Sequence, residues 1–133
     1  PGWTTKPSQD YVLMLVSAAG QSISLDVPDL PVHLPGMIPI GLVKNGYLDD
    51  LRKRVGSLTV VEDAPRQFPD ANAHLVHTTW SNGGQEFVEV TQLFVHNDRV
   101  YIIRSDSTAD AYEATRAAFD AVVQSIRWIK NSP

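Results

Sequence analysis

The chain has 133 residues, of which 43% are hydrophobic and 20% are charged, and its formal net charge at pH 7 is −4. This composition is typical of a folded globular domain and excludes a disordered chain. Arg52-Lys53-Arg54 is the only cluster of basic residues, which argues against nucleic acid as a partner. The length suits a single domain over residues 1–133, and no apolar run approaches the roughly 18 residues that a membrane-spanning helix needs.

The sequence contains no cysteine. This excludes thiol catalysis and thiolate metal sites, but it leaves the compartment open, since both cytosolic and exported domains can lack cysteine. The chain begins with Pro1-Gly2-Trp3 and not with Met, so we expect a processed or trimmed form.

The first half of the chain predicts a hairpin and then a helix. Segments 11–16 and 21–27 are apolar-rich strands, the first expected to be buried on both faces and the second on one. Segment 28–39 has four prolines and excludes a regular helix or a central strand. From Pro39 to Gly56, apolar residues recur at spacings of three and four, which predicts a helix. Its apolar stripe is Ile40, Val43, Tyr47, Leu51 and Val55.

The second half predicts strands and a final helix. We expect a short strand over 58–62, a loop or irregular edge over 64–72, and strands over 74–80, 87–96 and 99–104. The helix is expected to start at an N-cap, Ser107 or Thr108, and to end near Lys130. Its expected inward stripe is Tyr112, Thr115, Phe119, Val122, Ile126 and Ile129. The predicted order is ββ-α-βββ-α, an α+β fold in which an antiparallel sheet of about six strands has a helix on each face.

The turn between the last two strands predicts their register. Asn97-Asp98 tolerates the positive φ that a tight hairpin turn requires. This turn places Phe94 opposite Tyr101 and Leu93 opposite Ile102, so apolar side chains point out of both faces of the sheet. Both faces therefore need a cover.

Two segments of the chain resemble the PsbP-like superfamily. Pro1-Gly2-Trp3 resembles the end of a first strand in such proteins. The stretch Tyr101-Ile102-Ile103-Arg104-Ser105-Asp106-Ser107 resembles their strand that ends in small polar residues, and Ser125-Ile126-Arg127-Trp128 resembles their closing Ser-aliphatic-basic-Trp phrase. The superfamily contains the photosystem II extrinsic protein PsbP, the Ran-binding nuclear import factor, and small bacterial proteins of the cell envelope or of secretion systems.

The resemblance implies an α/β/α sandwich that usually lacks catalytic residues and serves as a docking or accessory module. We therefore expect a non-enzymatic, protein-docking module without a cofactor, in the cell envelope or a secretion apparatus. An extracytoplasmic location is favoured, with a cytoplasmic accessory protein as the alternative. The protein partner is not identified, because the sequence has no counterpart of the Ran-binding surface or of the photosystem protein's functional histidine.

His74 and His77 are the most obvious candidate metal ligands. Side chains alternate along a strand, so a spacing of three residues places the two rings on opposite faces. We therefore expect two ordinary sheet histidines and no metal site.

A candidate polar site follows from the register across Gly83-Gly84. Four residues are predicted to share one face of the sheet, and they are Thr78, Glu89, Thr91 and Arg104. Glu89 and Arg104 are then diagonal neighbours about 7 Å apart at the backbone, within reach of an ion pair. One interpretation is a site for a small ligand or anion, or for a weak hydrolase. The other is a structural salt bridge, which we favour because structural ion pairs are commoner than catalytic ones.

A candidate interface lies in the proline-rich segment, which is apolar and uncharged after Asp29. The residues expected to contact a partner are Leu30, Val32, Leu34, Met37 and Ile38. Such a stiff, adaptable patch suits protein binding. Alternatively, the segment packs its own side chains under the edge of the sandwich. A further hypothesis is a homodimer built through an exposed strand.

Overall fold

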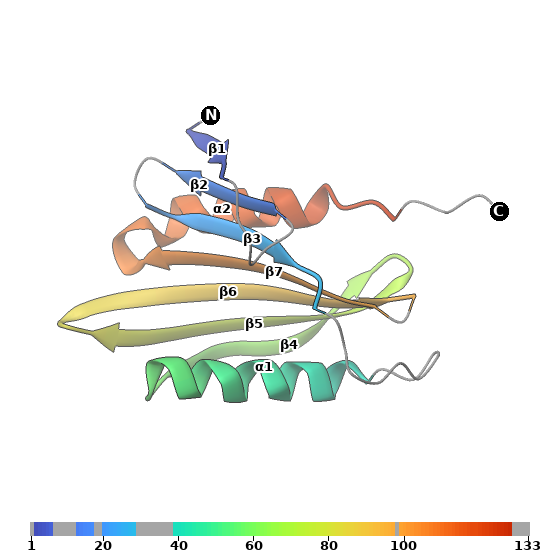
Figure 1. Cartoon of the computed structure of the whole chain (residues 1–133), viewed down its shortest axis with the longest axis horizontal. Coiled ribbons are helices and arrows are strands. Elements are labelled where there is room, and N and C mark those ends of the chain that lie inside the picture. Colours follow the sequence, from blue (N-terminus) through green and yellow to red (C-terminus); the bar gives the residue numbers. More distant parts are fainter. Residues whose placement is uncertain (1, 7–12, 18–19, 29–38, 98, 129–133) are drawn as a thin grey trace.

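The computed structural model describes residues 2–6, 13–17, 20–28, 39–97 and 99–128. Seven strands form one antiparallel sheet in the order β1-β2-β3-β7-β6-β5-β4, and two helices pack on it (Figure 1). The strands are β1 (Trp3–Thr5), β2 (Leu13–Ser17), β3 (Ser22–Asp26), β4 (Thr59–Phe68), β5 (Ala71–Asn82), β6 (Gln85–His96) and β7 (Arg99–Thr108). The helices are α1 (Ile40–Val55) and α2 (Tyr112–Gln124), with a 3-10 turn at Ala109–Ala111 before α2. The predicted α+β fold is confirmed, with seven strands and not about six.

The predicted hairpin registers are confirmed. Phe94 pairs with Tyr101 and Leu93 with Ile102, and the turn residue Asn97 has a φ of 49°. The preceding hairpin turns at two glycines, both with positive φ, between the paired ends of β5 and β6. These turns set which residues share a face over the three central strands.

The two helices cover opposite faces of the sheet. Leu93 and Phe94 are neighbours on β6 and therefore point to opposite faces, and both are fully buried. Leu93 packs in a cluster with Leu48 of α1, whereas Phe94 packs in a cluster with Phe119 of α2. We call these two sides the α1 face and the α2 face.

The helix α1 has the predicted bounds. It starts directly after Pro39, and at its end the N–H of Gly56 donates to the carbonyl oxygen of Arg52 at 2.9 Å. Gly56 has a φ of 78°, a conformation that glycine adopts without steric cost. The basic residues of the last turn interact favourably with the negative, C-terminal end of the helix dipole.

The prediction of a loop or irregular edge over 64–72 is only partly correct, because residues 64–68 lie at the sheet edge but form a regular strand. β4 continues to Phe68 and β5 starts at Ala71, so only a tight turn separates two long strands. Pro65 lies within β4, opposite His74. Because β4 is at the edge of the sheet, the missing N–H of Pro65 removes no hydrogen bond from the interior of the sheet.

The prediction for the final helix is only partly correct. Ser107 and Thr108 end β7, and Thr108 is the N-cap of the 3-10 turn that precedes α2, without a side-chain capping hydrogen bond. The α-helix itself starts at Tyr112 and ends well before the expected Lys130. Phe119 is on the inward side as predicted and is 1% exposed. Ile126 follows the helix and packs against the same core, while Ile129 lies outside the described residues.

The prediction that the first hairpin strand is buried on both faces is also wrong. None of the described residues of β2 is buried, and Leu13 is 42% exposed. The principal contacts of α1 and α2 are with β5, β6 and β7, so the two helices contact β2 only little. Apolar side chains on this strand are therefore accessible.

Candidate functional site

A cluster of charged groups lies on the α1 face and contains the predicted ion pair. Arg104 Nε lies 3.3 Å from Glu89 Oε1 and 3.3 Å from Asp106 Oδ2. Thr78 and Thr91 share this face through their pairing with Glu89 and Arg104, as predicted. One cation therefore lies between two carboxyl groups that are next to each other across β6 and β7.

Tyr47 of α1 closes this cluster from above the sheet. Its hydroxyl group donates a hydrogen bond to Glu89 Oε1 at 2.7 Å and lies 2.6 Å from Thr91 Oγ1. Since a hydroxyl group has one proton, Thr91 donates to Tyr47 when Tyr47 donates to Glu89. The sequence pattern assigns Tyr47 to the apolar stripe of its helix, and 42 residues separate it from Glu89, so its polar contact is not predictable locally.

The carboxyl group of Glu89 has an unusual protonation equilibrium. Burial raises the pKa of Glu89 from 4.5 to about 7, and the nearby Asp106 raises it as well, while Arg104 and the hydrogen bond from Tyr47 act in the opposite direction. Burial also raises the pKa of Asp106, against the effect of Arg104. Glu89 is only 1% exposed, so its proton is held away from solvent.

A cavity of about 600 Å³ lies beside this cluster, between α1 and the strands β3 and β7. Tyr47 and Arg104 line it, and Asp26, Asp50 and Arg54 add charges of both signs. The three other predicted site residues, Glu89, Thr78 and Thr91, are at most 1% exposed. Within the cluster, Tyr47 and Arg104 line this cavity, and the binding role of Arg104 and of the other three predicted residues stays a prediction.

The two candidate metal histidines lie on opposite faces, as predicted. His74 Nε2 contacts Asp63 Oδ1 on the α1 face, and Lys44 Nζ lies 3.1 Å from the other oxygen of Asp63. His77 is on the α2 face, where its ring stacks on Tyr112 at a centroid distance of 5.1 Å. The described part of the chain contains no group of three or more side chains suited to hold a metal ion.

The predicted interface residues Leu30, Val32, Leu34, Met37 and Ile38 lie outside the described residues. Their role in contacting a partner stays a prediction. None of the described helices is long and apolar enough to cross a membrane.

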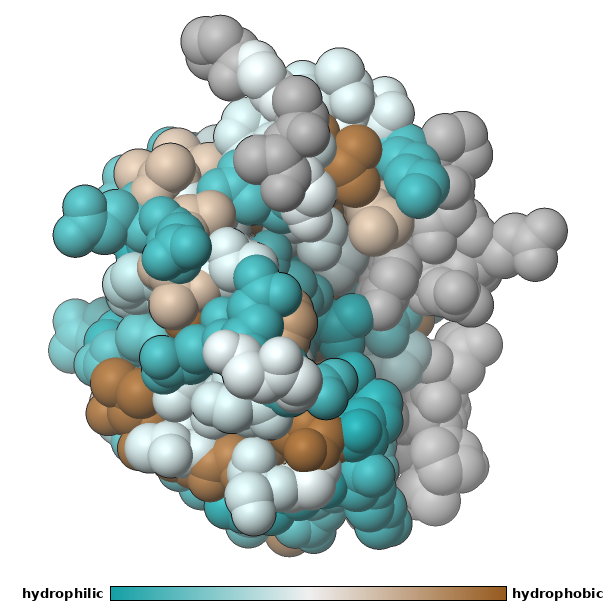
Figure 2. Space-filling view, turned by 90° about the vertical axis from the view of Figure 1, so that its left-hand side faces the viewer, coloured by the Kyte–Doolittle hydropathy of each residue, from teal (hydrophilic) through white to brown (hydrophobic). Residues whose placement is uncertain are grey.

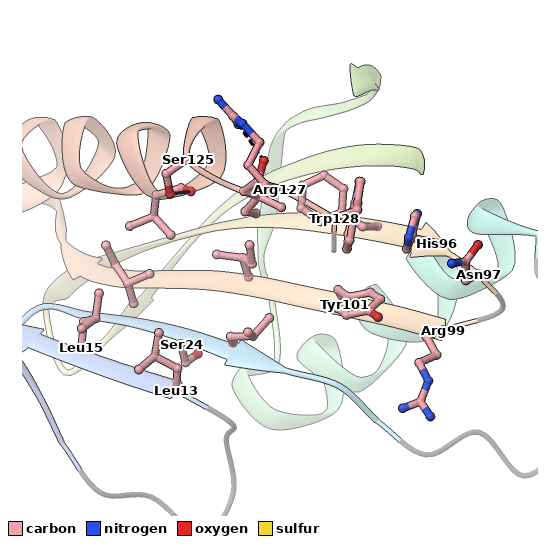
Figure 3. A pocket seen from close by; sticks show the side chains of 16 residues that line it. Leu13, Leu15, Ser24, His96, Asn97, Arg99, Tyr101, Ser125, Arg127 and Trp128 are labelled. Atoms are coloured by element: carbon pink, nitrogen blue, oxygen red, sulfur yellow. Dashed lines mark hydrogen bonds between the residues drawn. The ribbon is translucent and has the colours of Figure 1, made fainter. Parts of the chain in front are cut away.

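A second cavity, of about 720 Å³, lies on the α2 face between the sheet and the segment that follows α2 (Figure 3). We call it the apolar pocket. Strands β2, β3, β6 and β7 form its floor, and the end of α2 and the residues after it form the opposite wall. Its apolar lining consists of Leu13, Leu15, Ile23, Leu25, Phe94, Tyr101, Ile103, Val122, Ile126 and Trp128.

Trp128 forms a fixed wall of the apolar pocket. Its Nε1 donates to the carbonyl oxygen of Pro69 at 2.9 Å, and the ring of His96 stacks on it at a centroid distance of 4.0 Å. Phe94 and Tyr101 meet the indole edge-on. Because these contacts hold the indole from several sides, the pocket is preformed at this end.

The apolar pocket was not predicted from the sequence, because its lining comes from distant segments. Two local signals point toward it. The apolar run of β2 lacks a polar alternation, although the strand is near the sheet edge. The chain also keeps Ile126 and Trp128 apolar after α2 has ended. Together these signals indicate apolar surface without a covering helix.

The opposite end of the molecule has a different surface. Figure 2 shows the end that carries the turn between β5 and β6, where hydrophobic residues form separate spots among hydrophilic ones. The visible described residues at this end therefore form no broad apolar patch, in contrast to the apolar pocket.

No protein-family model and no curated protein matches the sequence. Solved structures do match the fold. The solution structure of cyanobacterial PsbP, CyanoP, from Synechocystis matches with a TM-score of 0.72 at 9% identity, over 96% of this chain and 82% of that chain. The crystal structure of a protein of unknown function from Pseudomonas aeruginosa matches with a TM-score of 0.62 at 14% identity, over 98% and 100%. The fold is therefore PsbP-like, as the resemblance implied.

Proposed function

We propose that the chain is a non-enzymatic binding or accessory module whose binding element is the apolar pocket. The observation that carries this proposal is a preformed cavity of about 720 Å³ with a mainly apolar lining. Ligand sites in proteins commonly have this size and composition. The PsbP-like fold, which docking and accessory proteins of the cell envelope and of secretion systems share, supports a role in such an assembly.

The uncovered lining supports binding over simple packing. Leu13 remains 42% exposed, and Leu15 and Leu25 are only partly buried. The apolar side chains grouped around this concavity expose apolar surface to water. An apolar ligand or protein segment that binds there would bury this surface. Because Trp128 is already held in place, such a ligand finds an ordered wall, which lowers the entropic cost of binding.

An uncharged fluorescent probe tests this proposal. N-phenyl-1-naphthylamine emits more strongly in apolar surroundings, and we expect saturable binding of one molecule per chain. Leu15→Glu places a charge in the pocket lining and is expected to weaken this binding at least about tenfold, because burying an unpaired charge is costly. Val61→Glu is the matched control, since Val61 is 56% exposed on β4 and lies outside the pocket.

Two results would contradict this proposal. One is the absence of saturable binding by the folded wild-type chain. The other is an equal loss of affinity in the Leu15→Glu and Val61→Glu variants.

A second candidate function is the binding of a small anion in the cavity beside α1. The observation that favours it is that Arg104 and Arg54 both line this cavity. Titration with inorganic phosphate, followed by the NMR signals of the cavity residues, tests it. Binding should weaken in Arg54→Ala and persist in Lys53→Ala, which removes an equal charge from the same helix end.

A further inference from the structure

The charged side chains among the described residues that line the apolar pocket all have one sign. None of these residues is Asp or Glu, whereas Arg99 and Arg127 are cationic. The whole chain has the opposite bias, with 15 acidic residues against 11 Lys and Arg and a net charge of −4. The charge of the described lining is therefore opposite in sign to the net charge of the chain.

The basic side chains lie at the rim and not in the apolar interior. Figure 3 shows Arg99 extending from the start of β7 and Arg127 from the wall after α2, both directed away from the apolar lining. Arg99 is exposed and forms no ion pair with any described residue. Arg127 donates to the carbonyl oxygens of Gln124 and Ile126, which holds its guanidinium near the pocket wall. Figure 3 shows the two side chains extending in opposite directions, so each cation meets water at its own part of the rim.

This arrangement is complementary to an amphiphile. An apolar chain would contact the apolar lining, and an anionic head group would remain in water at the rim, which carries Arg99 and Arg127. A cationic head group would meet like charge, and a neutral one would gain nothing from the basic rim. A cavity of about 720 Å³ has the size typical of a site for one small molecule, so a single chain fits the space better than a large multi-chain lipid.

We propose that the apolar pocket binds a single-chain amphiphile with an anionic head group, such as a fatty-acid carboxylate. This inference rests on the proposed function, because it requires the apolar pocket to accept a ligand. It adds the chemical class of that ligand and assigns the head group to Arg99 and Arg127.

Displacement of N-phenyl-1-naphthylamine by three ligands of equal chain length tests the inference. These ligands are decanoate, decanol and decyltrimethylammonium, each used below the concentration at which it forms micelles or separates from solution. We expect decanoate to displace the probe at a concentration at least about tenfold lower than decyltrimethylammonium. Extending the carboxylate from ten to twelve carbons should tighten binding about sixteenfold, since each buried methylene group contributes about a fourfold gain in affinity.

Paired charge variants identify the head-group site. Arg99→Ala combined with Arg127→Ala should weaken decanoate binding about tenfold. Arg52→Ala combined with Lys53→Ala removes the same charge from the exposed end of α1 and should leave decanoate affinity unchanged. Both double variants should unfold cooperatively at temperatures close to that of the wild type.

The outcomes separate this inference from the proposed function. Saturable probe binding with equal displacement by all three ligands overturns the anionic head group and leaves the apolar pocket as a binding site. Equal losses in the two double variants overturn the assignment to Arg99 and Arg127. Failure of the probe and of every ligand to bind overturns both proposals.

Discussion

The two faces of the sheet differ in which side chains they bury and which they leave exposed to solvent. On the α1 face, Glu89 is only 1% exposed and is enclosed by Tyr47, Thr91 and Arg104. On the α2 face, the apolar lining of the pocket stays partly open, and the charged side chains are at its rim. Residues that alternate along the same strands thus build an enclosed ionic cluster on one side and an accessible apolar cavity on the other.

The difference shows that a group with a shifted pKa need not lie where a ligand can reach it. Perturbed carboxyl groups often mark functional sites, but they do so most convincingly when a ligand can reach them. Here Glu89, whose pKa is raised to about 7, is sealed, whereas the accessible cavity contains ordinary apolar side chains. We therefore expect substitutions on the α1 face to act mainly on stability, and substitutions in the apolar pocket to act mainly on binding.

The largest expected effect is that of Arg104→Met on stability. Removing this cation leaves Glu89 buried without its charged partner, which costs about 3–5 kcal/mol at pH 8, where Glu89 is mostly ionised, by analogy with broken buried ion pairs. The loss should be smaller at pH 5, where Glu89 is protonated. Urea unfolding at both pH values measures it. Arg116→Met is the control, because its pair with Asp120 is at the surface of α2 and should contribute less than about 1 kcal/mol.

A comparable loss of stability is expected when the pH rises. The folded-state pKa of Glu89 is raised from 4.5 to about 7, so the folded chain holds this proton more tightly than the unfolded chain. The contribution of this bound proton to the unfolding free energy is fully present below pH 4.5 and is lost as the pH rises through 7. The loss is at most about 3 kcal/mol. Glu89→Gln removes this titration.

Urea unfolding of both chains between pH 5 and pH 8 isolates the contribution of Glu89. The difference in unfolding free energy between wild type and Glu89→Gln should change steadily across this range, to the disadvantage of the wild type at high pH. A constant difference would contradict the raised pKa. Comparison with the variant is necessary because the pKa of His77 is lowered, chiefly by burial, and its titration acts in the opposite direction.

An intermediate effect is expected for Tyr47→Phe. This change removes the hydrogen bond to Glu89 and leaves the Thr91 hydroxyl group without its partner on α1. The expected loss is about 1–2 kcal/mol in the unfolding free energy. The hydrogen bond from Tyr47 lowers the pKa of Glu89, so this pKa should rise further in the variant, as carboxyl NMR titration can show. An unchanged stability and pKa would mean that Tyr47 does not close the cluster.

The smallest effect on stability is expected for Leu15→Glu in the apolar pocket. The side chain is already partly exposed on β2, so the loss should stay below about 1 kcal/mol, close to that of Val61→Glu. Binding of the uncharged probe should nevertheless fall at least about tenfold in the first variant alone. A large loss of stability would instead identify the pocket lining as part of the packed core.

The register of the central strands is predictable because it depends on local turns. Gly83-Gly84 and Asn97 fix which residues oppose each other, and this is enough to place Glu89 and Arg104 on one face. The helix before Gly56 is likewise predictable from its spacing and its glycine stop. These features depend on short-range geometry.

The remainder depends on contacts between distant segments. Pro65 suggests a loop, and only its position in an edge strand makes a long β4 compatible with it. Tyr47 reaches Glu89 across a helix-to-sheet contact that periodicity does not reveal. The apolar pocket combines β2 and β3 with residues that follow α2. These segments come from opposite ends of the described part of the chain. Local patterns therefore predict the faces of the sheet but not which face remains open.

The central claim is that the apolar pocket on the α2 face is the ligand site. Methyl NMR spectra during titration with N-phenyl-1-naphthylamine test it most directly. The claim predicts saturable shifts for Leu13, Leu15 and Leu25, with the methyl signals of Leu48 and Val43 of α1 unchanged. Shifts confined to residues on the α1 face, or no shifts at all, would contradict it.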